Sequence, residues 1–154
     1  MKGIRVKRKS LANVRCPIAQ TLERVGDQWS ILILRDAIKG AKRFDDFQRS
    51  LEIAPNTLTC RLNDLVDHGF LVRQRYSEHP PRDEYLLTER GKDFQSVVQA
   101  FVGFGNRNFR EDSGHVVFID TNTGHEADPI TVDRHSGEII RAPRFEFQSA
   151  EQQA

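Results

Sequence analysis

The chain has 154 residues, of which 29% are charged and 38% hydrophobic, and its formal net charge is +1. This composition is ordinary for a folded domain and excludes a chain that is disordered throughout. The longest apolar run, WSILIL, is far shorter than the roughly 20 residues that a bilayer requires, so no membrane span is predicted. The basic N-terminus is not followed by an apolar segment as in a secretory signal, and we expect a cytoplasmic protein with two reduced cysteines.

The charged residues are unevenly distributed along the chain. Residues 1–110 hold 20 Lys and Arg against 13 Asp and Glu, a net charge of +7, whereas residues 111–154 hold 3 against 9, a net charge of −6. Residues 1–15 contain no acid, which is typical of an arm that contacts polyanions, although a solvated terminus has the same composition. We therefore predict a basic arm at 1–15, a central domain at 16–110 and an acidic extension at 111–154.

Local signals predict three helices in the first third of the chain. Pro17 fits the first position of a helix capped by Cys16, and Gly26 ends this helix. Asp27 is the predicted cap of a second helix, which Gly40 ends. Its apolar positions face nearly every direction, so it should form the buried centre of the fold. A short third helix covers FDDFQRSL, where Phe and Leu recur at spacings of three and four.

Segment 55–67 follows a tight turn and is predicted to be an amphipathic helix. Its inward stripe consists of Leu58, Leu62, Leu65 and Val66. Its outward face carries Asn56, Thr57, Cys60 and Asp64, flanked by Arg61 and Asn63.

A hairpin and a last helix follow. The compositions of FLVRQRY and EYLLT predict two strands, and SEHPPRD between them predicts a loop, so the wing of the hairpin spans 76–84. Thr88 is the predicted cap of one long helix, ERGKDFQSVVQAFVGFGNRNF, whose apolar stripe packs either on its own core or on a helix of a second subunit. The candidate dimer-interface residues on this stripe are Phe94, Val97, Val98, Phe101 and Phe104.

The acidic extension contains an internal repeat. VFIDTNTGHE and ITVDRHSGEI share the pattern V/I-D-x-x-S/T-G at a separation of thirteen residues. Each is typical of a strand, a turn and a strand with Gly at the position that needs a positive φ, so we predict a small β appendage over 115–147. His115, His125 and His135 are ten residues apart and no CxxC pair is present, so no metal site is predicted.

The order of these elements predicts a winged helix-turn-helix, an α+β fold that is mainly α. A major groove admits one helix, whose side chains read base edges while basic groups hold phosphates. We therefore predict helix 55–67 in the major groove and wing 76–84 on the adjacent groove or backbone. The predicted DNA contacts are Asn56, Thr57, Thr59, Arg61 and Asn63 on the helix, Lys42 and Arg43 before the third helix, and His79 and Arg82 on the wing.

Three stretches carry a resemblance to a known family. CPIAQTLERVGDQWSILILRD, RFDDFQRSLEIAPNTLTCRLNDLVDHGFLVRQ and PPRDEYLLTERGKDF closely resemble the HxlR-type winged-helix transcriptional regulators of bacteria, within the MarR-like superfamily, over residues 16 to about 104. The resemblance implies a homodimer formed through the first and last helices. It also implies two recognition helices on a pseudo-palindromic operator in double-stranded DNA, and a role as repressor or activator, of which we favour repressor. One departure is Ala54, where the family commonly has Ser, and losing such a cap costs a helix about 1 kcal/mol.

The two cysteines have different expected roles. Cys16 matches the position of the sensing cysteine in redox- and electrophile-responsive members of this family. A thiol at a helix N-cap beside Arg15 lies where the helix dipole and a cation favour the reactive thiolate. The alternative is a small buried residue at a dimer seam, because free cysteine is among the most buried residue types. Cys60 lies deeper in its helix, so we expect a sensing role for Cys16 rather than for Cys60.

Enzymatic function is not expected, because G-x-G-x-x-G, P-loop, G-x-S-x-G and H-E-x-x-H motifs are absent from the sequence. No cofactor is predicted either. Two alternatives to an oxidant-responsive regulator stay open: a winged-helix module that binds proteins without reading DNA, and a regulator that responds to a small molecule bound at the dimer seam.

Overall fold

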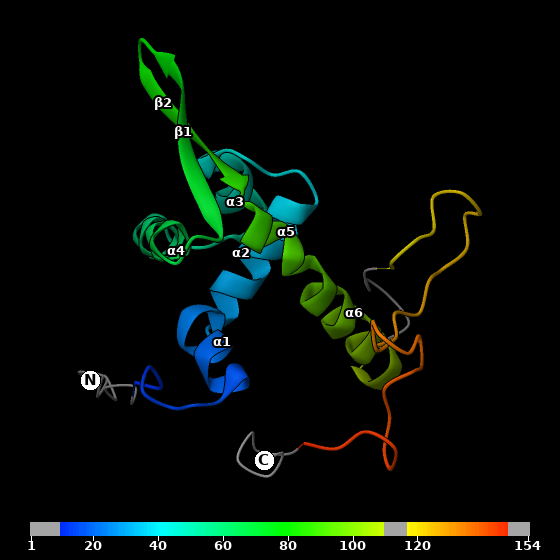
Figure 1. The fold of residues 1–154 in the computed structure, drawn as a ribbon. Coiled ribbons are helices and arrows are strands. Elements are labelled where there is room, and N and C mark those ends of the chain that lie inside the picture. Colours follow the sequence, from blue (N-terminus) through cyan, green and yellow to red (C-terminus); the bar gives the residue numbers. More distant parts are fainter. Residues whose placement is uncertain (1–9, 110–116, 148–154) are drawn as a thin grey trace, which may run out of the picture. The chain divides into compact units, whose positions relative to one another are not determined.

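The computed structural model describes residues 10–109 and 117–147, and Figure 1 shows its elements. The basic residues Lys2, Arg5, Lys7, Arg8 and Lys9 of the predicted arm, and His115, lie outside the described residues. The elements are α1 (Pro17–Val25), α2 (Gln28–Ile38), α3 (Phe44–Leu51), α4 (Pro55–Asp67), β1 (Leu71–Glu78), β2 (Pro81–Leu87), α5 (Glu89–Asp93) and α6 (Gln95–Phe109). Contacts divide the chain into two units, Met1–Val98 and Gln99–Ala154, so the division falls within α6.

Helices α1 to α4 begin and end close to where local sequence signals predicted. Cys16 is the N-cap residue of α1, and Asp27 caps α2 by accepting the backbone amides of Trp29 and Ser30 at 3.0 Å each. Gly40 follows α2 with a φ of 104°, a left-handed conformation that glycine adopts without strain. None of the helices in the described residues is long and apolar enough to cross a bilayer.

The core of this unit is centred on α2, as the sequence predicted. Ile33 and Leu34 on α2 have no exposed surface, and α2 contacts α3, α4 and β2. In Figure 1 α2 lies among the other helices of this unit. The other buried apolar side chains of the core are Val25, Ala37, Phe47, Ile53, Leu58, Leu62, Leu65, Phe70, Leu71, Tyr85, Phe94 and Val98.

Strands β1 and β2 form an antiparallel hairpin that projects from the helices (Figure 1). Leu71 pairs with Leu87 at its base and Glu78 with Pro81 at its end, with a register shift between Arg75 and Ser77. The loop predicted over SEHPPRD is therefore mostly strand, and only the two residues between β1 and β2 form the turn. Cross-strand pairing extends the hairpin beyond what the Pro-Pro and charged composition indicated.

The single long helix predicted after Thr88 is wrong, because Phe94 interrupts it and separates α5 from α6. The Ser96 hydroxyl donates to the Asp93 carbonyl, and the Val97 amide donates to the carbonyl of Phe94, three residues back. Side-chain insertion of this kind disrupts the regular hydrogen-bond ladder of a helix. The predicted cap is confirmed, since the Thr88 hydroxyl accepts the Gly91 amide.

In the second unit the predicted strands are reduced to isolated bridges, Ile119 with Glu126 and Val132 with Ile139. The predicted turns are confirmed, since Gly124 and Gly137 have φ values of 74° and 73°. The repeat is also a repeat of hydrogen bonds. Each of these glycine amides donates at 2.8 Å to the carbonyl four residues back. The short segments make too few ladder hydrogen bonds to count as strands, but their turns follow the repeated sequence.

Candidate nucleic-acid interface

The outward face of α4 is polar and open to solvent. Asn56, Thr59, Cys60 and Asn63 are exposed, Thr57 is half-buried, and Leu58, Leu62 and Leu65 on the opposite face have no exposed surface. The core thus fixes the rotation of α4 and leaves amide and hydroxyl side chains pointing outward. These are the side-chain types that hydrogen-bond to base edges.

The start of α4 has no side-chain cap. Ala54 is the N-cap residue and Pro55 the first helical residue, so the predicted loss of a capping oxygen is confirmed. The Thr59 hydroxyl donates to the Pro55 carbonyl at 2.9 Å, which leaves its oxygen able to accept. The backbone amides at this end of α4 are therefore without a capping side chain.

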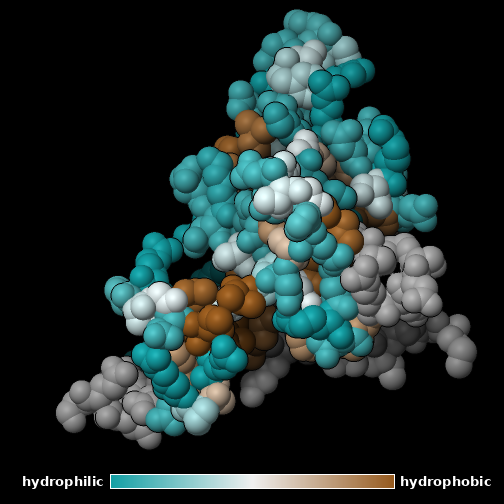
Figure 2. Space-filling model, turned by 90° about the vertical axis from the view of Figure 1, so that its right-hand side faces the viewer, coloured by the Kyte–Doolittle hydropathy of each residue, from teal (hydrophilic) through white to brown (hydrophobic). Residues whose placement is uncertain are grey.

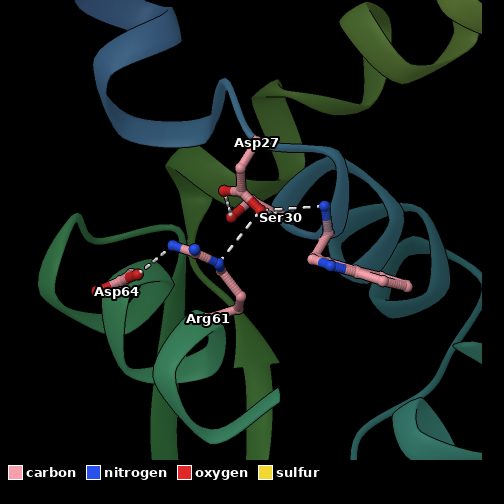
Figure 3. Close-up of polar contacts among 5 residues, drawn as sticks. Asp27, Ser30, Arg61 and Asp64 are labelled. Carbon is pink, nitrogen blue, oxygen red and sulfur yellow. Dashed lines mark hydrogen bonds and ion pairs between the residues drawn. The ribbon is translucent and has the colours of Figure 1, made fainter. Parts of the chain in front are cut away.

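Arg61 differs from the other predicted helix contacts, because two carboxylates hold its guanidinium. Its Nε lies 3.3 Å from Asp27 Oδ1, and its Nη1 lies 2.9 Å from Asp64 Oδ2. Figure 3 shows Arg61 pointing toward Asp27 at the start of α2. The side chain of Arg61 therefore does not lie with the exposed amide side chains of α4.

Lys42 and Arg43 are exposed and adjoin the hairpin, a contact that sequence reasoning missed. The Tyr85 amide donates to the Lys42 carbonyl at 2.7 Å, and Arg43 forms a bridge with Glu84. The Arg43 guanidinium lies 4.8 Å from the ring centre of Tyr76 on β1. The segment before α3 is therefore attached to the wing by one isolated bridge and one further backbone hydrogen bond, and it lies beside the hairpin.

The wing carries more positive charge than the two predicted residues, His79 and Arg82, both of which are exposed. Arg73 and Arg75 on β1 also project from the hairpin, and both pair with Asp83 on β2. Hydrogen bonds from these two guanidinium groups lower the pKa of Asp83, and Asp83 in turn raises the pKa of Arg75. The alternation of R-Q-R within a predicted strand was the signal that could have identified Arg73 and Arg75.

Both cysteines are free thiols. Cys16 is half-buried at the start of α1 and makes no side-chain capping hydrogen bond. Cys60 is exposed in the middle of the polar face of α4. The two thiols thus lie on different surfaces, one at the α1 terminus and one on the candidate interface.

The predicted dimer stripe divides into two groups. Phe94 and Val98 are buried in the core of the first unit and have little surface left for a partner. Val97, Phe101 and Phe104 are exposed, the last two by 55% and 53%. On α1, Ile18 and Leu22 are also exposed, by 58% and 41%. Figure 2 shows hydrophobic areas open to solvent among hydrophilic ones on the face that it draws.

A family model places the chain among known proteins. The model for the HxlR-like helix-turn-helix matches residues 24–113, more than half of the chain. The chain belongs to the HxlR-like helix-turn-helix family. An uncharacterized HTH-type transcriptional regulator of Mycobacterium tuberculosis is 37% identical over 126 residues, which cover 81% of this chain and 80% of the relative.

Two solved structures extend this comparison. The crystal structure of PA1607, a candidate transcription factor, has a TM-score of 0.81 and 33% identity over 91% of this chain and 99% of that chain. Because residues 1–110 are less than three quarters of the chain, this match includes part of the extension. The redox regulator HypR in its reduced form has a TM-score of 0.57 and 33% identity over 60% of this chain and 95% of that chain.

The protein is thus a transcriptional regulator with a helix-turn-helix DNA-binding domain, and this family consists of regulators and not of enzymes. The predicted winged helix-turn-helix and the family resemblance are confirmed. The roles of individual site residues, the dimer and the signal stay predictions.

Proposed function

We propose that the protein is a homodimeric repressor that binds a pseudo-palindromic operator in double-stranded DNA. The observation that supports this most directly is the exposed polar face of α4, whose rotation the buried leucines of the same helix fix. A helix presented in this way suits a major groove, where amide side chains discriminate base pairs by bidentate hydrogen bonds.

The roles of the site residues follow from their position and chemistry. Asn56, Thr57, Thr59 and Asn63 read base edges. Lys42, Arg43 and Arg82 hold phosphates, and His79 reaches the adjacent groove from the tip of the wing. Arg73 and Arg75 add positive charge along the same hairpin.

The second copy of the chain covers the exposed apolar residues of α1 and α6. Ile18 and Leu22 lie one turn apart on α1, and Phe101 and Phe104 lie at a spacing of three on α6. Exposed aromatic and branched side chains at helical spacing are typical of a helix that packs against a partner. A two-fold dimer would also supply the second α4 that a palindromic site needs.

The test uses a duplex selected from a random library by the wild-type protein. We expect its affinity to fall steeply between about 50 and 200 mM salt, because bound phosphates release counterions. Asn56→Ala should weaken binding about tenfold, the loss of one base contact, without changing the dimer or the melting temperature. The matched control is Gln95→Ala, an exposed amide on α6. A wild-type protein that enriches no duplex would instead indicate a protein-interaction module.

We further propose that oxidation of Cys16 releases the operator. Two observations support this: the half-buried thiol lies at the start of α1, and HypR, a redox regulator, has a similar fold. Peroxide converts a thiolate to a sulfenic acid and releases hydroxide. We expect peroxide to abolish operator binding by the wild-type protein and by Cys60→Ser, and to leave Cys16→Ser active. If Cys16→Ser responds like the wild type, Cys16 is not the sensor.

A further inference from the structure

Arg61 was predicted to contact DNA, but its surroundings suit a different role. At about 100° per residue along a helix, Cys60 and Asn63 lie within about 40° of Asn56 around the axis of α4, whereas Arg61 lies about 140° away. Its side chain is 36% exposed. Its Nε atom is buried and makes no hydrogen bond, so it meets Asp27 Oδ1 as an ion pair at 3.3 Å. Arg61 therefore lies on the flank of α4, between the polar face and the core.

The carboxylate that meets this flank belongs to Asp27, which is itself fixed. Oδ1 of Asp27 accepts the amides of Trp29 and Ser30, and Oδ2 accepts the hydroxyl of Ser30, whose side chain is buried. Figure 3 shows these contacts converging on one carboxylate at the start of α2. A carboxylate held by three donors of α2 moves little relative to that helix, so Asp27 faces the Arg61 guanidinium in a fixed orientation.

Asp27 is also close in sequence to the helix on which we place the dimer seam. α1 ends at Val25, and Gly26 alone separates it from Asp27. Val25 is buried in the core, and α1 contacts α4 directly. A displacement of α1 would therefore move Asp27 or break its contact with Arg61.

We propose that Arg61 is a positioning residue, and that its contact with Asp27 transmits the position of the α1–α2 corner to the recognition helix α4. This inference rests on the proposed function, because it explains how a change at the dimer seam reaches the DNA-reading face. Asp64 contributes the second carboxylate from α4 itself, and so it orients the guanidinium without linking two helices.

Two variants remove the ion pair from opposite sides. Asp27→Asn keeps the shape and the capping oxygen of Asp27 but loses the charge that faces Arg61, because Asn caps a helix about as well as Asp. Arg61→Met keeps an unbranched stem and loses the guanidinium. Asp64→Asn is the matched control, since it removes a carboxylate that contacts Arg61 within the same helix.

The measurement is the ratio of affinities for the duplex selected by the wild-type protein and for a scrambled duplex. We expect Asp27→Asn and Arg61→Met each to lower this ratio about tenfold, because a misoriented α4 loses aligned base contacts. The double variant should be no worse than either single variant, since both remove the same ion pair. Affinity for the scrambled duplex and its salt dependence should stay at wild-type values, and Asp64→Asn should have little effect.

Other roles for Arg61 give different results. If Arg61 reads a base directly, Arg61→Met lowers the ratio but Asp27→Asn does not. If Arg61 holds a phosphate, Arg61→Met weakens binding to both duplexes and reduces the salt slope by about one. Either pattern overturns the proposal.

A second readout does not require DNA. In the absence of DNA, the amides of α4 should exchange hydrogen faster in each single variant than in the wild-type protein. Exchange in α2 should be unchanged. If the wild-type protein enriches no duplex, the proposed function fails while this measurement still reports on the contact. If the amides of α4 exchange at the wild-type rate in Asp27→Asn, the ion pair does not hold α4, and the proposal is wrong.

Discussion

The first unit and the extension are stabilised by different interactions. In the first unit Ile33, Leu34 and Phe47 have no exposed surface, so burial of apolar side chains holds the helices together. No residue between 117 and 147 is buried, and the two turns of this segment are held by hydrogen bonds of exposed groups. A repeated sequence can therefore specify a repeated local structure without a core. A single substitution in such a structure should change the free energy of unfolding less than one in the core of the first unit.

The largest expected effect comes from the tight packing around a glycine of the first unit. A Cβ atom on Gly91 in α5 would lie 2.2 Å from the carbonyl oxygen of Phe70 and 2.9 Å from a methyl group of Leu87. The first neighbour is backbone and cannot rotate away. We expect Gly91→Ala to destabilise the fold by about 3 kcal/mol, at the upper end of overpacking effects. Because each kcal/mol shifts the melting temperature of a small domain by about 4–8 °C, the melting temperature should fall by more than about 10 °C.

Gly105 in the second unit is the matched control. A Cβ atom there meets nothing within 4 Å, and the residue lies within α6. Gly105→Ala should stabilise the protein slightly, by up to about 1 kcal/mol, because alanine favours the helix. Thermal unfolding followed by circular dichroism measures both variants. Equal melting temperatures would contradict the expectation that the close contacts of Gly91 leave no room for a methyl group.

The sequence predicted those parts of the fold that depend on neighbouring residues. Asp27 and Thr88 cap the helices that follow them, and the leucines of α4 face inward, as their spacing indicated. The positive φ values of Gly124 and Gly137 followed from the turn pattern in the same way. In each case the deciding contact lies within about four residues.

The features that the sequence did not predict depend on contacts between distant residues. The bridge of Arg43 with Glu84 joins segments 41 positions apart, and nothing in either segment alone indicates the pairing. The helix break at Phe94 accompanies a close edge-to-face contact of its ring with Phe70. Arg61 has the residue type of a DNA contact, and only its distance from Asp27 indicates another role. Residue type and order thus located the candidate interface, but not the partners of its side chains.

A smaller effect is expected in the turns of the extension. Hydrogen bonds from the hydroxyl and amide of Ser136 lower the pKa of Asp133. The amide of Asn122, with a contribution from Thr123, lowers the pKa of Asp120 in the first turn. A lowered pKa means that the folded turn favours the carboxylate. Its stabilisation is therefore complete above the ordinary aspartate value of 3.8 and is lost as the pH falls through the folded pKa.

Ser136→Ala separates the two turns. Without the Ser136 hydroxyl, the pKa of Asp133 should rise toward its ordinary value while that of Asp120 stays low, so the first turn is an internal control. Carboxyl carbon chemical shifts recorded by NMR between pH 6 and pH 2.5 measure both groups in one sample. If the extension had a shared core, loosening the second turn would disturb the first, and both pKa values would move. Independent titration would show that each turn is a local structure, as expected for a segment that buries no side chain.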